Sequence, residues 1–159
     1  MYRIGFGYDV HRLEAGHTLR LGGIAIPYDQ GLVGYSDADV LLHAITDALL
    51  GATGLGDIGT HFPSTDPQYK DVDSRVLLRI AMDQVSSGGW MIANIDTTVV
   101  MEQPRLAPHV HSMRSSIAGV LGLREDQVSV KGKTTDGLGF TGAGEGIAAY
   151  AVVLLAREQ

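Results

Sequence analysis

The strongest constraint on this sequence is its last regular segment, residues 146–155, where apolar side chains fill nearly every position. From Ala148 to Leu155 the residues are apolar without interruption, yet the run is far shorter than the roughly 18 residues of a membrane-spanning helix. A strand with one solvated face alternates apolar and polar residues instead. We therefore expect a strand with both faces covered, one by helices of the same chain and the other by a second subunit.

Extended and helical patterns alternate along the chain, which favours an α/β fold with a mixed open sheet covered by helices on one face. We expect strands at residues 2–10, 18–26, 90–101, 128–133 and 146–155. We expect helices at residues 37–54, 73–88 and 108–122. Ser36 or Asp37 is the expected cap of the first helix, and residues 54–71 form a long loop. Because no repeat or linker interrupts the chain, we expect residues 1–159 to form one domain.

Charge and composition exclude several classes of function. The formal net charge is −6, which opposes nucleic-acid binding, since that needs a basic face. The chain has no cysteine, so a metal ion must be held by His, Asp or Glu. We expect no membrane span and no signal peptide. The expected location is the cytoplasm, or the plastid stroma if a transit peptide has been removed.

Two motifs carry side chains that suit a metal ion. Asp9 and His11 are two residues apart in an extended segment, so both point to one side of a strand. His43 lies in an apolar helix, with Asp39 and Asp47 one turn to either side. A neighbouring carboxylate fixes the tautomer of a ligating histidine, although Asp39 could instead support the helix start. Alone, each motif also fits a surface pair or a core histidine, but together they match an open His2Asp zinc site.

Two glycine-rich segments suit a phosphate group. The first comprises residues 54–59 and 62–66, whose glycines let backbone N–H groups approach a ligand. The second comprises residues 133–142 and begins with a cation, two hydroxyls and a carboxylate, which suits a phosphate bridged by a divalent metal. Each segment alone could equally be an ordinary loop or turn.

Taken in order, these segments resemble the 2-C-methyl-D-erythritol 2,4-cyclodiphosphate synthases, enzymes of non-mevalonate isoprenoid biosynthesis. The resemblance covers essentially the whole chain. It rests on residues 4–5, 8–11, 36–40 with His43, 46–48, 56–59, 62–63, 65–67, 73–75, 138–142 and 144–147.

The resemblance implies an intramolecular cyclisation. The substrate would be a cytidine diphosphate ester of methylerythritol 2-phosphate, whose 2-phosphate attacks the β-phosphorus so that CMP leaves. One Zn²⁺ per subunit would be held by Asp9, His11 and His43, and a second divalent ion, Mg²⁺ or Mn²⁺, would lie near Asp136. The resemblance also implies a homotrimer with active sites between subunits. Two alternatives stay open: a metal phosphohydrolase on the same site, and a degenerate member that only binds metal and nucleotide.

The resemblance further implies which residues form the site. Catalytic roles fall on Tyr35 and Thr134. The residues implied in substrate binding are Asp9, Val10, His11, Tyr35, Ser36, Asp57, Ile58, Gly59, Phe62, Pro63, Ser64, Thr65, Asp66, Met101, Glu102, Gln103, Pro104, Arg105, Leu106, Ala107, Lys133, Thr134, Thr135, Asp136, Phe140 and Ala143. Five positions depart from the family pattern, all at the substrate site: Tyr35 for a common His, Ser64 for Asp, Asp136 for Glu, Gly137 for Lys and Ala143 for Arg.

Overall fold

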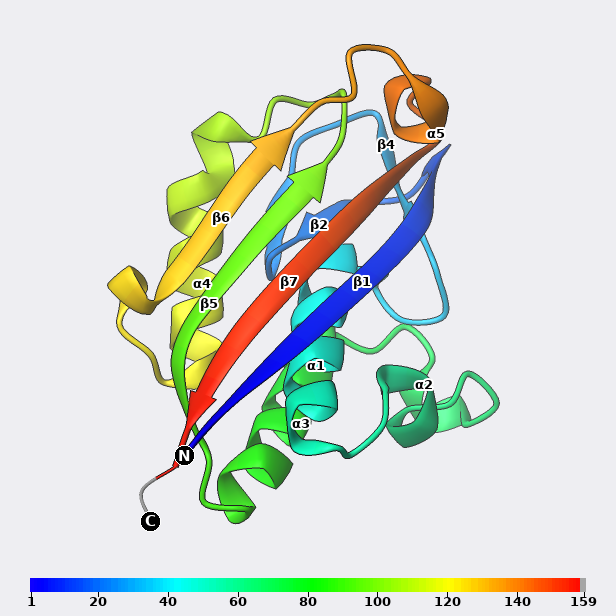
Figure 1. Cartoon of the computed structure of the whole chain (residues 1–159). Helices are drawn as coiled ribbons and strands as arrows, with labels where there is room; N and C mark the ends of the chain where they lie inside the picture. Colours follow the sequence, from blue (N-terminus) through cyan, green and yellow to red (C-terminus); the bar gives the residue numbers. More distant parts are fainter. Residues whose placement is uncertain (158–159) are drawn as a thin grey trace.

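A computed structural model describes residues 1–157 of the chain (Figure 1). The strands are β1 (Tyr2–Ala15), β2 (Leu19–Leu21), β3 (Ile24–Ile26), β4 (Gln30–Val33), β5 (Met91–Val100), β6 (Val128–Lys133) and β7 (Gly146–Ala156). The α-helices are α1 (Val40–Thr53), α2 (Ile58–His61), α3 (Ser74–Ser87), α4 (Val110–Leu121) and α5 (Gly139–Gly142). Three short 3₁₀ turns are η1 (Pro67–Tyr69), η2 (Ala107–His109) and η3 (Glu125–Gln127).

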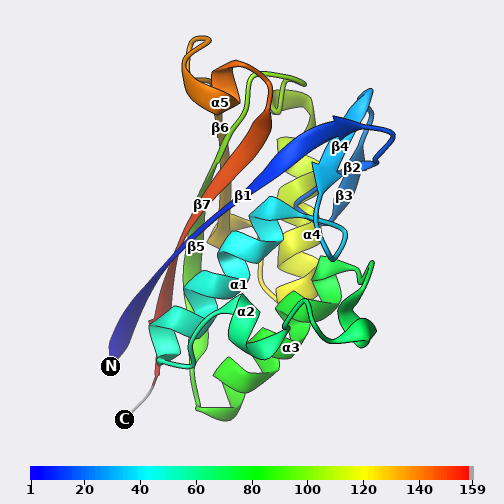
Figure 2. The same ribbon diagram turned by 90° about the vertical axis from the view of Figure 1, so that its right-hand side faces the viewer.

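The main sheet has the strand order β4-β1-β7-β5-β6. Its β5–β6 pair is parallel and its other pairs are antiparallel, so the sheet is mixed. The long helices α1, α3 and α4 all lie on one side of it, as Figure 2 shows. The predicted α/β architecture, a mixed sheet covered by helices on one face, is therefore confirmed. Among the described residues, no helix combines the length and hydropathy needed to cross a membrane.

Helix α1 lies at the centre of the core. Its apolar side chains are buried on nearly all sides, between β1 and β7 on one side and α3 on the other (Figure 2). The helix begins at Asp39, whose carboxylate accepts the N–H of Leu42, and ends at Gly54, which adopts a left-handed conformation with φ 71°. The predicted helix is therefore present, but the expected cap at Ser36 or Asp37 is wrong.

The backbone of β1 lies directly against α1 because two glycines leave no side chain between them. A Cβ atom added at Gly5 would lie 1.8 Å from the carbonyl oxygen of Ala48, and one at Gly7 would lie 1.8 Å from that of Ala44. No real side chain tolerates such a distance. This contact sets the separation between the strand that carries Asp9 and the helix that carries His43.

Several boundaries differ from those predicted. Strand β1 continues to Ala15, so Asp9 and His11 lie within the strand and not at its end. Residues 18–26 form a hairpin of β2 and β3 that turns at Gly22 and Gly23, both with positive φ. Strand β4 pairs with the second half of β1 and was missed, because it is short and lacks a clear alternating pattern. The loop at residues 54–71 contains α2 and η1.

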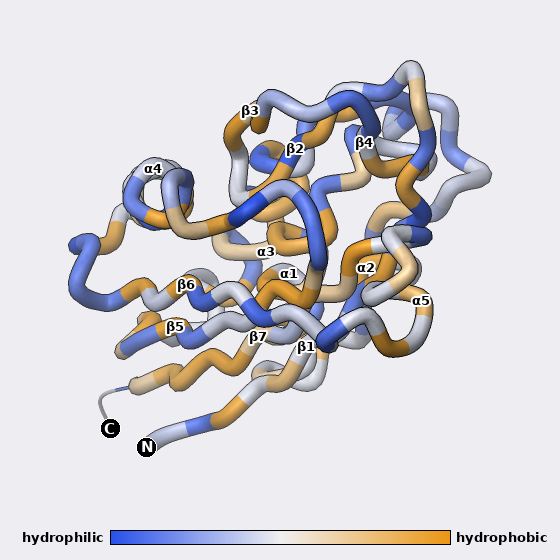
Figure 3. The backbone as a smooth tube through the Cα atoms, turned by 90° about the horizontal axis from the view of Figure 1, so that it is seen from above, coloured by the Kyte–Doolittle hydropathy of each residue, from blue (hydrophilic) through white to orange (hydrophobic). Residues whose placement is uncertain are grey.

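The outer face of the sheet carries large apolar side chains without a cover from this chain. Tyr2, Ile4 and Phe6 of β1 are more than 60% exposed. The rings of Tyr8 and Tyr150 on adjacent strands pack with centroids 5.0 Å apart. Hydrophobic residues are prominent along β7 in Figure 3. Both faces of β7 are thus apolar, as predicted, and Tyr150 and Val152 on the face away from the helices remain exposed within the chain.

We expect Gly7→Ala to destabilise the fold by about 3 kcal/mol, because its methyl group meets helix backbone that cannot move aside. Gly51→Ala is the matched control. It adds the same methyl group to α1 in open space and should stabilise the helix by about 0.5–1 kcal/mol. Urea unfolding followed by circular dichroism measures both. Equal midpoints for the two variants would show that the strand–helix contact is not tight.

Candidate metal and nucleotide site

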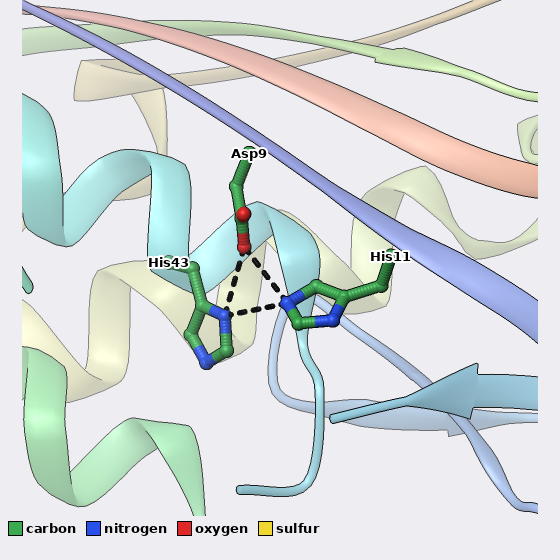
Figure 4. Close-up of side chains that lie close together, drawn as sticks. All are labelled: Asp9, His11 and His43. Atoms are coloured by element: carbon green, nitrogen blue, oxygen red, sulfur yellow. Dashed lines mark hydrogen bonds and ion pairs between the residues drawn. The ribbon is translucent and has the colours of Figure 1, made fainter. Parts of the chain in front are cut away.

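Asp9, His11 and His43 converge at one point between β1 and α1 (Figure 4). One carboxylate oxygen of Asp9 lies 2.9 Å from Nδ1 of His43 and 3.0 Å from Nε2 of His11. These two ring nitrogens are 3.2 Å apart. All three ligand atoms lie within 4.8 Å of one another. The structure thus brings together the three residues that the sequence nominated as metal ligands, with both histidine nitrogens aimed inward.

The outward nitrogen of each histidine is also engaged. Nδ1 of His11 lies 2.8 Å from the carbonyl oxygen of Val33 in β4. A carbonyl only accepts, so this nitrogen donates. The inward Nε2 faces the carboxylate of Asp9, and a metal ion bound there would take the place of the proton that these two groups share. Nε2 of His43 lies 2.8 Å from the hydroxyl of Ser74 and 3.1 Å from that of Ser36. Such outer contacts are typical of metal-ligating histidines.

The electrostatics of the group favour a positive ion. Burial opposes ionisation of Asp9, but hydrogen bonds from His11 and His43 outweigh it and lower its pKa. Burial likewise opposes the charged form of His11, but Asp9 outweighs it and raises the pKa of His11. The carboxylate therefore stays ionised and stabilises positive charge beside it. Two imidazoles and one carboxylate are a donor set that Zn²⁺ accepts.

Asp39 does not orient His43, so that interpretation of the sequence is wrong. Its buried carboxylate accepts the backbone N–H groups of Gly22, at 2.9 Å, and Gly23, at 2.7 Å, as well as capping α1. Burial raises the pKa of Asp39. The carboxylate therefore supports the start of α1, which is the structural alternative that the sequence had left open, and it also ties the β2–β3 hairpin to that start.

Asp47 does not orient His43 either. Its carboxylate accepts the backbone N–H of Ile58 at 2.7 Å, and burial raises its pKa. It therefore ties the middle of α1 to the first turn of α2, which projects beyond the β1 edge of the sheet (Figure 1). Helical spacing had placed Asp47 correctly on the face of His43, but a separate segment reaches that face and takes the carboxylate.

A cavity of about 250 Å³ opens beside the three ligands. Most of its lining was predicted, but Tyr69 and Leu77 were missed, since only the folded chain brings η1 and α3 to this wall. The lining residues are Asp9, His11, Tyr35, Ser36, His43, Ile58, Gly59, Phe62, Ser64, Tyr69 and Leu77.

Other predicted residues lie around this cavity without lining it. Asp57 caps α2 and Asp66 caps η1, so both carboxylates already accept backbone N–H groups. Pro63 and Thr65 belong to the connection between these turns. Val10 is 40% exposed and, by the alternation of the strand, lies on the opposite face of β1 from the two ligands.

Tyr35 lies in the cavity wall, and its hydroxyl donates to the backbone carbonyl of Asp66 at 3.1 Å. The backbone of Tyr35 accepts the N–H of Asp71 at 2.8 Å. Tyr35 therefore joins the segment before α1 to both ends of the η1 loop. No pattern in the sequence indicates this contact.

A second cavity, of about 560 Å³, lies where the parallel strands β5 and β6 end. The segment 101–107 forms one wall and contains a cis peptide bond before Pro104. The carboxylate of Glu102 accepts the backbone N–H groups of Thr135, at 3.0 Å, and Gly137, at 3.2 Å. The lining residues are Met101, Glu102, Gln103, Pro104, Arg105, Leu106, Ala107, Val110, Gly132, Lys133 and Thr134.

Among residues 1–157, the two cavities have no lining residue in common. A single chain therefore does not place Lys133 and Thr134 in the wall of the cavity beside Asp9, His11 and His43, which is called the metal cavity below. Asp136 lies in the turn after Thr135, with a positive φ of 53°. Phe140 belongs to α5 and Ala143 follows it, beside the outer face of the sheet.

Comparison with known proteins agrees with this geometry. The YgbB family model matches residues 2–156. The 2-C-methyl-D-erythritol 2,4-cyclodiphosphate synthase of Syntrophomonas wolfei is 59% identical over 153 residues, which are 96% of this chain and 98% of that protein. A similarly named synthase from Moorella thermoacetica is 60% identical over 96% of this chain and 94% of its own.

Solved structures agree as well. A 2C-methyl-D-erythritol-2,4-cyclodiphosphate synthase in its CDP-bound form matches with a TM-score of 0.90 and 42% identity, over 97% of this chain and 100% of that one. The bifunctional IspDF of Campylobacter jejuni matches with a TM-score of 0.96 and 42% identity, over 100% of this chain and 43% of that longer one. Since the family match spans the whole sheet and both cavities, this chain belongs to the YgbB family.

Proposed function

We propose that this protein converts 4-diphosphocytidyl-2-C-methyl-D-erythritol 2-phosphate to 2-C-methyl-D-erythritol 2,4-cyclodiphosphate with release of CMP. The observation that carries the proposal is the convergence of Asp9, His11 and His43 in the wall of a cavity. Relatives that bear this activity in their names match nearly the full chain. A similar structure has CDP bound, which supports a cytidine nucleotide as part of the substrate.

The proposed reaction is a phosphoryl transfer within one molecule. An oxygen of the 2-phosphate forms a bond to the β-phosphorus, and the bond from that phosphorus to the oxygen shared with the α-phosphate breaks. CMP leaves with the electron pair of the broken bond. The reaction is therefore a CMP-releasing cyclisation of the lyase type, with no oxidant and no water consumed. Its main requirements are positioning and neutralisation of negative charge.

The residues of the two cavities can meet these requirements. A Zn²⁺ ion held by Asp9, His11 and His43, with a second divalent ion, Mg²⁺ or Mn²⁺, near Asp136, would supply positive charge to the phosphate oxygens. Thr134 offers a hydroxyl and Lys133 an ammonium group to the diphosphate. The segment 101–107 forms the wall against which the nucleotide would lie. Ser36, Ser64 and the α2 segment line the side where the erythritol part would bind.

The proposal includes a homotrimer with active sites between subunits. Two features support it. The metal cavity and the cavity formed by segment 101–107, here called the nucleotide cavity, are separate within one chain. An adjacent subunit would have to place its nucleotide cavity beside the metal cavity. The outer face of β1 and β7 also exposes a contiguous set of large apolar side chains, which is characteristic of a protein–protein interface. The proposed partners are thus two further copies of this chain and a small nucleotide diphosphate, without nucleic acid or membrane.

Incubation with the proposed substrate tests the function directly. We expect stoichiometric CMP and a single cyclic diphosphate in the ³¹P NMR spectrum, because both phosphates stay in one ring. A metal phosphohydrolase, with water attacking the β-phosphorus, would instead release CMP and an open-chain bisphosphate that shows two separate phosphomonoester signals. A protein that only binds metal and nucleotide would leave the substrate unchanged, and either result would contradict the proposal.

Two variants separate the two metal sites. His43→Ala should lose most of the bound zinc, because one of three ligands is gone. Asp136→Ala should retain zinc but reduce kcat by at least about tenfold, because a ligand of the second ion is removed. Asp136→Glu is the control, since it keeps a carboxylate. Metal analysis and steady-state kinetics measure these effects. Full zinc content in His43→Ala would show that His43 is not a zinc ligand. Full turnover in Asp136→Ala would show that Asp136 does not hold the second ion.

Light scattering should give three times the mass of the chain. Phe6→Asp places a charge on the outer face of β1, and we expect it to dissociate the trimer and abolish turnover. Val76→Asp introduces the same charge at an exposed position of α3, away from that face, and should remain trimeric. An active wild-type monomer would rule out sites between subunits, and a trimeric Phe6→Asp would place the interface elsewhere.

Tyr35 should contribute to catalysis less than the histidine common in the family. A tyrosine hydroxyl is a neutral donor, and a neutral donor is about half as strong as a charged one. The single proton of this hydroxyl goes to the carbonyl of Asp66 in this structure and would have to turn to the substrate to act on it. Tyr35→Phe removes this donor and should lower kcat/KM about fivefold, the value of one hydrogen bond. Tyr35→His should raise kcat/KM about tenfold. Unchanged kcat/KM in both variants would leave Tyr35 without a role in the reaction.

A further inference from the structure

The outward nitrogen of His43 begins a buried chain of polar groups that the family resemblance leaves unassigned. Nε2 of His43 lies 2.8 Å from the hydroxyl oxygen of Ser74, the first residue of α3. That hydroxyl lies 2.5 Å from a carboxylate oxygen of Asp37. The second carboxylate oxygen accepts the backbone N–H of Ser74 at 3.0 Å. Ser74 is fully buried, and His43 is 7% exposed.

The chemistry of these groups fixes the direction of each hydrogen bond. The carboxylate of Asp37 is contacted by the N–H of Asp39, the N–H of Ser74 and the hydroxyl of Ser74, and it accepts from all three. The Ser74 hydroxyl therefore gives its only proton to Asp37. Its oxygen can then only accept from His43, so Nε2 of His43 carries a proton. In a neutral imidazole, the inward Nδ1 is left with its lone pair.

We propose that Ser74 and Asp37 are positioning residues, which hold His43 in the Nε2–H tautomer and aim its Nδ1 at the metal ion. The proposal rests on the proposed function, because it assumes that the three converging residues bind a metal. It assigns to Asp37, through Ser74, the orienting role that the sequence had placed on Asp39 or Asp47. His11 needs no such chain, because the Val33 carbonyl holds its outward nitrogen directly.

The backbone keeps this chain in place. The N–H of Asp37 donates to the carbonyl of Val72 at 3.0 Å, and the N–H of Asp71 donates to the carbonyl of Tyr35 at 2.8 Å. The segment before α1 is thus paired with the segment before α3. Asp73 caps α3 and fixes the position of Ser74 at its first turn. The orienting groups therefore sit on rigid elements, as a precise metal site requires.

Ser36 offers a second hydroxyl to the same nitrogen of His43, at 3.1 Å. Its oxygen accepts the backbone N–H of Ala38 at 3.2 Å, and among residues 1–157 no carboxylate accepts the proton of this hydroxyl. Ser74, at a shorter distance and with Asp37 behind it, is the stronger acceptor. The hydroxyl of Ser36 also lies 3.5 Å from that of Ser74, and because Ser36 lines the cavity beside the three ligands, its hydroxyl can turn toward the substrate.

Zinc affinity, measured by competition with a chromophoric chelator, tests the proposal without relying on activity. Ser74→Ala and Asp37→Asn should each bind zinc about 10- to 100-fold more weakly than the wild type, the usual effect of losing such an outer partner. Ser87→Ala is the matched control, an exposed serine at the other end of α3, and its affinity should match the wild type. Thermal melting of the metal-free variants shows whether each one folds.

A second measurement needs no variant. In the zinc-loaded wild type labelled with ¹⁵N-histidine, we expect proton-bearing Nε2 in His43 and proton-bearing Nδ1 in His11. A His43 that carries its proton on Nδ1 overturns the proposal, even if Ser74→Ala fails to fold. Zinc affinity within twofold of wild type in a folded Ser74→Ala also overturns the proposal. The proposed function would still stand in that case if the wild type has cyclase activity and His43→Ala loses its zinc. A wild type that binds no zinc overturns both.

Discussion

The contact between the β1 backbone and α1 determines where the rest of the site can be. With hydrogen atoms alone at Gly5 and Gly7, the strand lies against the helix carbonyls of Ala48 and Ala44. The next inward position of the strand is Asp9, which the close approach brings within 2.9 Å of His43. A larger side chain at Gly5 or Gly7 would push the helix away from the sheet. The same displacement would move the imidazole of His43 away from the carboxylate of Asp9. Packing and metal geometry thus depend on one contact.

The polar groups around the start of α1 are costly to bury, and each is compensated by a specific partner. Burial raises the pKa of Asp39, but the N–H groups of Gly23 and Leu42 stabilise its charged form. In exchange, that carboxylate fixes the hairpin of β2 and β3 to the helix. Asp37 does the same for the start of α3. The start of α1 is therefore a junction of three segments, which gives His43 a rigid base.

The fold class and the group formed by Asp9, His11 and His43 could be predicted because they follow from local patterns. The alternation of a strand puts Asp9 and His11 on one side, and a helical apolar pattern buries His43. The partners of His43 could not be predicted in the same way. Helical spacing shows which residues share a face with His43, and so it pointed to Asp39 and Asp47. It cannot show that α3, arriving from more than 30 residues away, inserts its first side chain there. The short strand β4 could not be predicted either, because only its pairing with a strand distant in the sequence, β1, defines it.

The distribution of charge explains why a protein of this composition would need both metal ions and a second subunit. Among the described residues, the wall of the metal cavity contains no lysine or arginine, and Asp9 adds a negative charge to it. The fixed cations Arg105 and Lys133 line the other cavity. A diphosphate bound at the metal cavity alone would therefore meet positive charge only from bound ions and neutral donors such as backbone amides. If a neighbouring subunit presents its nucleotide cavity there, fixed cations and metal ions act on the same phosphates, and an acidic chain can bind a strongly anionic substrate.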